Sequence, residues 1–179
     1  VTISNGTISG NFVENGNGGA ISINSGSFLM DKVSQGNGAT IFGNSAISQT
    51  DNTGYGGGVY ITTGGQDVDV DILAGSIVGN SSTRHGGGIC VDLPSDEVTA
   101  TVTVGETGSN NLEYPNITSN ITLLSGGGLY VDGKHASVVI NSGKIQDNST
   151  VGYVDNPDIM NETGMVTLNG GDVKSVNVI

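Results

Sequence analysis

The chain of 179 residues has few of the residues that crosslink a fold, bind nucleic acid or cross a membrane. Its one cysteine, Cys90, excludes an internal disulfide framework. Five basic residues stand against 17 acidic ones, a formal net charge of -12, and because phosphate neutralisation needs clustered Lys and Arg, we expect no nucleic-acid partner. No apolar run approaches the roughly 18 residues of a membrane helix, so we expect no membrane insertion.

What the chain has in abundance is glycine, with 31 residues, together with Asn, Ser, Thr and regularly spaced Val and Ile. Turn formers and β-branched residues favour strands and bends over helices. The regular spacing of Val and Ile predicts strands with buried faces rather than disorder. We therefore predict an all-β fold.

A glycine triplet followed by a short apolar strand recurs along the sequence. It reads GGGVYI at 56–61, GGGICV at 86–91 and GGGLYV at 126–131, with a shorter relative, GGAISI, at 18–23 and a weaker copy, GATIF, at 38–42. Self-similarity of this kind usually decides the architecture. The spacing of the copies predicts a solenoid with coils of about 20 residues at first and 30 to 40 later.

A second pattern, apolar-x-apolar-x-x-Gly-x-apolar, starts at residues 1, 21, 70, 138 and 166 and predicts two strands joined by a bend at the glycine. Three residues after the last apolar position there is usually an asparagine, which suits a tight corner and forms a ladder if the corners superpose. These corner residues are Asn11, Asn80, Asn120 and Asn148. The stretches 92–100, 106–116 and 151–163 each contain one proline and are predicted to be loop insertions.

The glycine-triplet and asparagine-corner repeats resemble those of the polymorphic outer-membrane protein family and of adhesin-like bacterial surface proteins. The resemblance covers essentially the whole chain. It implies a right-handed parallel β-helix that is exported and displayed at the cell surface. We expect one β-helix domain over residues 1–179, taken from a longer repeat chain, because the pattern runs to both ends without a polar cap.

Alternation after each glycine triplet predicts an outward column of side chains. The column is Ser22, Phe42, Tyr60, Cys90 and Tyr130, beside a second one of Asn24, Asn44, Thr62, Asp92 and Asp132. Exposed rings next to amides and carboxylates are a common way to bind sugars, so Phe42, Tyr60, Tyr130, Asp92 and Asp132 are candidate ligand-facing residues. The alternative is that the rings only stack and stabilise the sheet.

Other candidate sites have less support. Asp67, Asp69 and Asp71 share one strand face and could bind Ca²⁺, but no calcium-binding loop motif accompanies them, so a solvated acidic face is the preferred reading. Arg84-His85 and Lys134-His135 could serve a polysaccharide lyase, but they occupy different places in the repeat. We therefore assign no catalytic, metal or cofactor-binding residue.

The sequence predicts a non-enzymatic, extracellular adhesin-like β-helix that acts as a stalk or as a binding surface for a glycan or a protein of a host or neighbouring cell. One alternative is a β-helical polysaccharide lyase or glycoside hydrolase. Another is a fibre or sheath subunit that self-associates through its uncapped ends.

Overall fold

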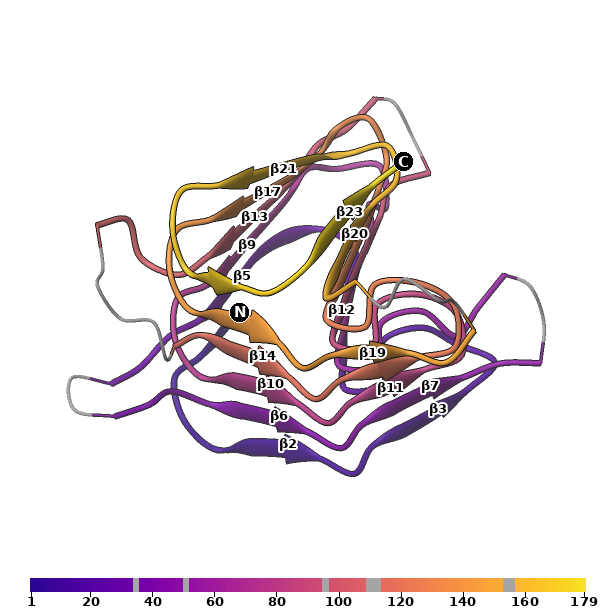
Figure 1. Cartoon of the computed structure of the whole chain (residues 1–179), viewed down its shortest axis with the longest axis horizontal. Coiled ribbons are helices and arrows are strands. Elements are labelled where there is room, and N and C mark those ends of the chain that lie inside the picture. Colours follow the sequence, from indigo (N-terminus) through magenta and orange to yellow (C-terminus); the bar gives the residue numbers. More distant parts are fainter. Residues whose placement is uncertain (34–35, 50–51, 95–96, 109–113, 153–156) are drawn as a thin grey trace.

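The structure is a computed structural model that describes residues 1–33, 36–49, 52–94, 97–108, 114–152 and 157–179. Within these ranges every regular element is a β-strand, and no helix long and apolar enough to cross a membrane occurs. The strands form four sheets, called A to D below, in which neighbouring strands are parallel and come from successive turns of the chain. The predicted all-β parallel β-helix is confirmed (Figure 1).

Each turn of the chain, or coil, passes through the sheets in the order A, B, C, D. Sheet A contains β1 (Thr2–Ile3), β5 (Gly26–Met30), β9 (Val68–Ile72), β13 (Ala100–Val104), β17 (Ala136–Ile140) and β21 (Met165–Leu168). Sheet B contains β2 (Thr7–Ser9), β6 (Thr40–Phe42), β10 (Ser76–Val78), β14 (Asn116–Thr118), β18 (Lys144–Gln146) and β22 (Asp172–Val173).

Sheet C has one strand fewer than the others because coil 6 runs from β22 to sheet D without a strand between them. It contains β3 (Phe12–Glu14), β7 (Ser45–Ile47), β11 (Ser81–Ser82), β15 (Ile121–Thr122) and β19 (Ser149–Thr150). Sheet D contains β4 (Ile21–Ile23), β8 (Val59–Ile61), β12 (Ile89–Asp92), β16 (Leu129–Asp132), β20 (Ile159–Asn161) and β23 (Val176–Val178).

The coils are longer at the start than the sequence predicted. Thr2 pairs with Leu29, 27 residues on, and Phe28 pairs with Val70, 42 residues on. The expected 20-residue period was wrong because the stretch 38–42 belongs to sheet B, where Ile41 pairs with Ile77. Gly38 makes the stretch look like a glycine-triplet repeat. Its strand is instead defined by Ile41, which lies three residues before the corner residue Asn44 and pairs with Ile77.

The main core lies inside the coil, where inward residues from the four sheets stack in layers. Sheet A shows the alternation most clearly, since Val68, Val70 and Ile72 are buried while Asp69 is exposed. The predicted insertions fall between β12 and β13, between β13 and β14, and between β19 and β20. The last prediction was too long, because Ile159–Asn161 forms β20 inside the stretch read as a loop.

The glycine triplets are required by close backbone stacking at the entry to sheet D. The first glycine takes a left-handed conformation, with φ +65 at Gly86. A Cβ at the second, Gly87, would lie 2.5 Å from the carbonyl oxygen of Ile121, a distance that real Cβ atoms do not show. Only glycine lets successive coils approach this closely.

The single glycines of the second pattern also adopt the predicted bend, as at Gly75 with φ +92. Four of its five matches lie at the corner between sheets A and B. The match that starts at residue 21 instead runs from sheet D into sheet A, because it begins in β4 and its glycine, Gly26, is the first residue of β5.

Candidate functional site

Four of the five residues of the predicted outward column, all except Phe42, lie in register on sheet D. Tyr60, Cys90 and Tyr130 pair in register, with Ser22 before them and Met160 after them. Phe42 does not belong to this column, because it lies on β6 of sheet B between Ser9 and Val78. It is the most exposed ring of the predicted set, at 52%.

The column is not on the surface, which corrects the predicted exposure. Tyr60 is 8% exposed, Tyr130 4% and Cys90 0%. The chain turns back after sheet C, and three covering segments, residues 54–58, 84–88 and 124–128, lie against the outer face of sheet D (Figure 1). They are themselves joined by backbone hydrogen bonds. The four central strands of sheet D, β8, β12, β16 and β20, are therefore buried on both faces: one face packs in the main core, and the other carries a second apolar strip of Tyr60, Cys90, Tyr130 and Met160.

An aromatic stack joins the covering segments to this strip. The His85 ring lies 4.2 Å from that of Tyr130 and 5.6 Å from that of Tyr55, close to parallel with both. Ser125 pairs with His85 across the covering segments. Burial, with a smaller effect of the Arg84 charge, lowers the pKa of His85 to about 4.

Both tyrosine hydroxyls are bound to carboxylates at the rim of sheet D. Tyr60 Oη donates to Asp92 Oδ2 at 2.9 Å, and Tyr130 Oη donates to Glu162 Oε2. Burial and these carboxylates raise the pKa of both phenols, and burial also raises the pKa of Asp92. Asp132 accepts a hydrogen bond from Thr163 Oγ1. Of the candidate ligand-facing residues, Asp92 and Asp132 therefore already have internal partners.

The asparagine corners form a continuous ladder of buried amides. On Asn120, Oδ1 accepts the backbone N–H and the Nδ2 of Asn80 at 2.9 and 3.0 Å. Its own Nδ2 donates to Asn148 Oδ1 and to the Ile77 carbonyl, both at 2.9 Å. Asn11 begins the ladder at its exposed end. All four predicted corner residues are thus rungs of one ladder.

Two rungs were not predicted. Asn44 is buried between Asn11 and Asn80 and bonds to both, although the sequence placed it in an outward column. Its Ile41-Phe42-Gly43-Asn44 spacing was a usable signal that the triplet-like glycine obscured. Asp158 carries no such signal, because it follows Pro157 rather than an isoleucine corner.

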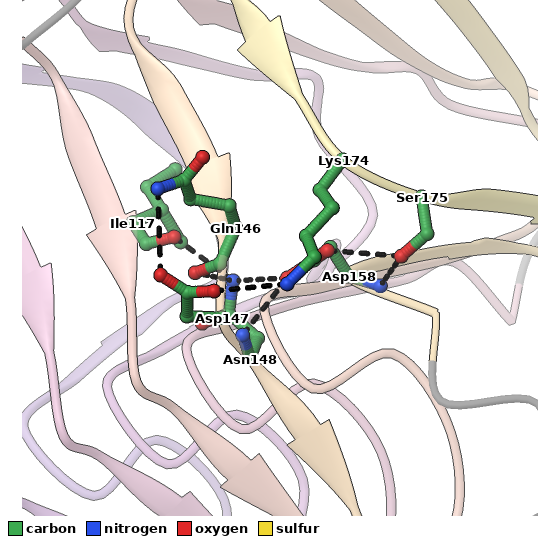
Figure 2. Close-up of polar contacts among 7 residues, drawn as sticks. All are labelled: Ile117, Gln146, Asp147, Asn148, Asp158, Lys174 and Ser175. Carbon is green, nitrogen blue, oxygen red and sulfur yellow. Dashed lines mark hydrogen bonds and ion pairs between the residues drawn. The ribbon is translucent and has the colours of Figure 1, made fainter.

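Asp158 ends the ladder with a carboxylate. Asn148 donates to Asp158 Oδ1 from its backbone N–H and from Nδ2, each at 2.9 Å, and Ser175 Oγ donates to Oδ2 at 2.9 Å. Figure 2 shows both residues pointing at the Asp158 side chain, beside the exposed Lys174–Asp147 ion pair at 3.0 Å. Because every rung donates in the same direction, the negative carboxylate lies at the donor end of the aligned amides, where it is favourable.

The remaining sequence candidates stay apart from one another. Asp67 is exposed and accepts hydrogen bonds from the backbone and hydroxyl of Thr99, which lower its pKa. Among the residues that the structure describes, no group of three His, Cys, Asp or Glu side chains could hold a metal ion. His85 lies in a covering segment, whereas His135 is exposed before β17.

Comparison with known proteins gives no match: no family model, no curated protein and no solved structure corresponds to this chain. The fold and the site therefore carry the functional argument.

Proposed function

We propose that the chain is a non-enzymatic, extracellular, adhesin-like segment whose β-helix acts as a rigid stalk. It holds loops and neighbouring parts of a surface protein at a fixed distance rather than binding a ligand on sheet D. The single observation that carries the proposal is the asparagine ladder, which ties five successive coils together through buried hydrogen bonds.

The burial of the predicted ligand-facing tyrosines favours a stalk over a glycan-binding face. Tyr60 and Tyr130, the two rings that were to stack on a sugar, lie beneath the covering segments and use their hydroxyls on Asp92 and Glu162. A sugar would have to displace those segments before it could reach the rings. Phe42 is exposed, but its column neighbours Ser9, Val78 and Thr118 offer neither a second ring nor a carboxylate.

A glycan-array screen tests the stalk. We expect no specific binding by the native chain and none by Tyr130→Ser. Specific binding that Phe42→Ser abolishes, with Val78→Ser as the matched control on the next strand of sheet B, would replace the stalk by an adhesive surface.

A second candidate is a self-associating fibre subunit, favoured by apolar surface at both ends of the coil. A cavity of about 290 Å³ opens at the first coil and is lined by Ile3, Ile21, Ile23 and Phe28, among others. Val178 is exposed at the other end. The ends do not match fully, since sheet C stops one coil early. Sedimentation velocity over a hundredfold concentration range separates the candidates: the stalk stays monomeric, and the fibre subunit grows end to end.

A further inference from the structure

The second apolar strip, on the outer face of sheet D, is separated from solvent by a thin cover. Gly86 lies directly over Cys90, since a Cβ on this glycine would be 2.7 Å from that of Cys90. Beyond the glycines, the side chains that add to the cover are the rings of Tyr55 and His85. Access to Tyr130 therefore depends on where the ring of His85 lies, and access to Cys90 depends on the position of Gly86, the next residue along the chain.

His85 has no polar anchor for its ring within the part of the chain that the structure describes. Its backbone carbonyl accepts hydrogen bonds from Gly56 N and Ser82 Oγ, which hold the segment. Its Nδ1 is buried without a hydrogen-bond partner. The imidazole is therefore held by stacking alone, and its buried, unpartnered Nδ1 fits the neutral ring, in which this nitrogen carries no proton.

Protonation of the His85 ring would destabilise its stacked position. An imidazolium needs acceptors for two N–H groups, and a buried N–H without an acceptor is destabilising. The titratable and charged groups around the ring are Tyr55 and Arg84 from the covering segments, Cys90 from β12, and Tyr130 and Asp132 from β16. Arg84 opposes the new charge and Asp132 favours it, and burial together with Arg84 outweighs Asp132 in lowering the pKa of His85.

We infer that His85 is an acid-sensitive latch: when it is protonated, its ring leaves the stack, Gly86 moves with it, and Tyr130 and Cys90 are uncovered. The opening moves residues 85 and 86 together, because Gly86 lies over Cys90 and follows His85 directly in the chain, while the four β-sheets keep their strand pairing. The open state presents the ring of Tyr130 and the thiol of Cys90, which the neutral protein hides. The latch does not depend on the stalk function.

Cys90 reports the opening, because it is the only thiol and is 0% exposed when the latch is closed. Its reaction with 4,4′-dithiodipyridine, a disulfide that still reacts with thiols in acid, is followed from pH 7 to pH 3.5. Each rate is divided by that of free cysteine at the same pH, and the far-ultraviolet circular dichroism is recorded on the same samples. We expect the normalised rate to rise at least tenfold below pH 5 while the β-sheet signal is unchanged.

Two variants make the assignment specific to His85. His85→Phe keeps a ring that cannot be protonated, and its Cys90 should stay protected throughout the range. His135→Phe changes the other histidine of the chain, which is exposed, and should open like the native protein. The latch is overturned if Cys90 stays protected in the native protein, if His85→Phe opens equally, or if reactivity appears only when the β-sheet signal is lost.

Discussion

Removing one central rung of the asparagine ladder, by Asn120→Ala, should destabilise the whole solenoid. The Asn120 side chain makes four hydrogen bonds, two through Oδ1 with Asn80 and two through Nδ2 with Asn148 and Ile77. It is 0% exposed, so no bulk water replaces them. The variant leaves the Asn80 backbone N–H without an acceptor, and it removes one hydrogen bond each from Asn80 Nδ2, Asn148 Oδ1 and the Ile77 carbonyl.

The cost follows from these lost bonds. At about 1 kcal/mol for each of four bonds, with more for the stranded donor, Asn120→Ala should lower the free energy of unfolding by about 4 kcal/mol. For a chain of this size that lowers the melting temperature by about 8–16 °C. Asn120→Asp should cost at least as much, because a carboxylate cannot donate to the Asn148 and Ile77 oxygens.

Thermal and urea unfolding, followed by circular dichroism, measure the effect. The matched control is Asn11→Ala at the exposed end of the ladder, where the backbone N–H of residue 11 still donates to Asn44 Oδ1 and the expected loss is about 0.5 kcal/mol. A loss below 1 kcal/mol for Asn120→Ala, or equal losses at the two positions, would refute the claim that the buried ladder holds the coils together.

Three other predictions concern the backbone and pH. Ser119 has φ 57, so Ser119→Gly should raise the free energy of unfolding by about 0.5 kcal/mol in urea titrations. Gly87→Ala should cost about 3 kcal/mol or more by thermal unfolding, because its Cβ meets the Ile121 carbonyl, whereas Gly36→Ala has only one atom at 3.8 Å and should be nearly neutral. Between pH 6.5 and about 4, His85 is protonated in the unfolded chain but neutral in the folded chain. The free energy of unfolding should therefore fall as the pH falls through this range. The pKa difference sets a ceiling of about 3 kcal/mol, reduced to about 1–2 kcal/mol for a half-buried ring. His85→Phe should remove this pH dependence of the free energy of unfolding in urea titrations at each pH.

The fold could be predicted from the sequence because each repeat carries its own physical requirement. The glycine triplets mark where backbones stack too closely for a Cβ, and the Ile-x-x-Asn corners mark where a buried amide must meet its counterpart. The register failed at Thr40–Phe42 because a single glycine there imitates a triplet. A local pattern could not separate the two kinds of strand when both begin with glycine and an apolar residue.

The candidate site was harder to predict because alternation gives the face of a strand and not what covers that face. The sequence correctly set Tyr60, Cys90 and Tyr130 on the side of sheet D that faces away from the main core. It could not show that the chain doubles back over them, since residues 84–88 carry no apolar run that would predict a covering layer. Asp158 was also missed, because it lies just before β20 of sheet D, outside the asparagine corners, and yet accepts the hydrogen bond from the last asparagine of the ladder, Asn148.

The central claim is that the chain is a rigid solenoid in which each coil advances by one strand spacing, as a stalk requires. Nitroxide labels at Thr2→Cys and Thr167→Cys test it by pulsed electron paramagnetic resonance, because these outward residues of sheet A lie five paired strands apart. At about 4.8 Å per strand, their backbones should be about 24 Å apart. We predict one narrow distance distribution near this value, allowing for the label arms. A broad distribution, or one centred far beyond it, would contradict the stalk.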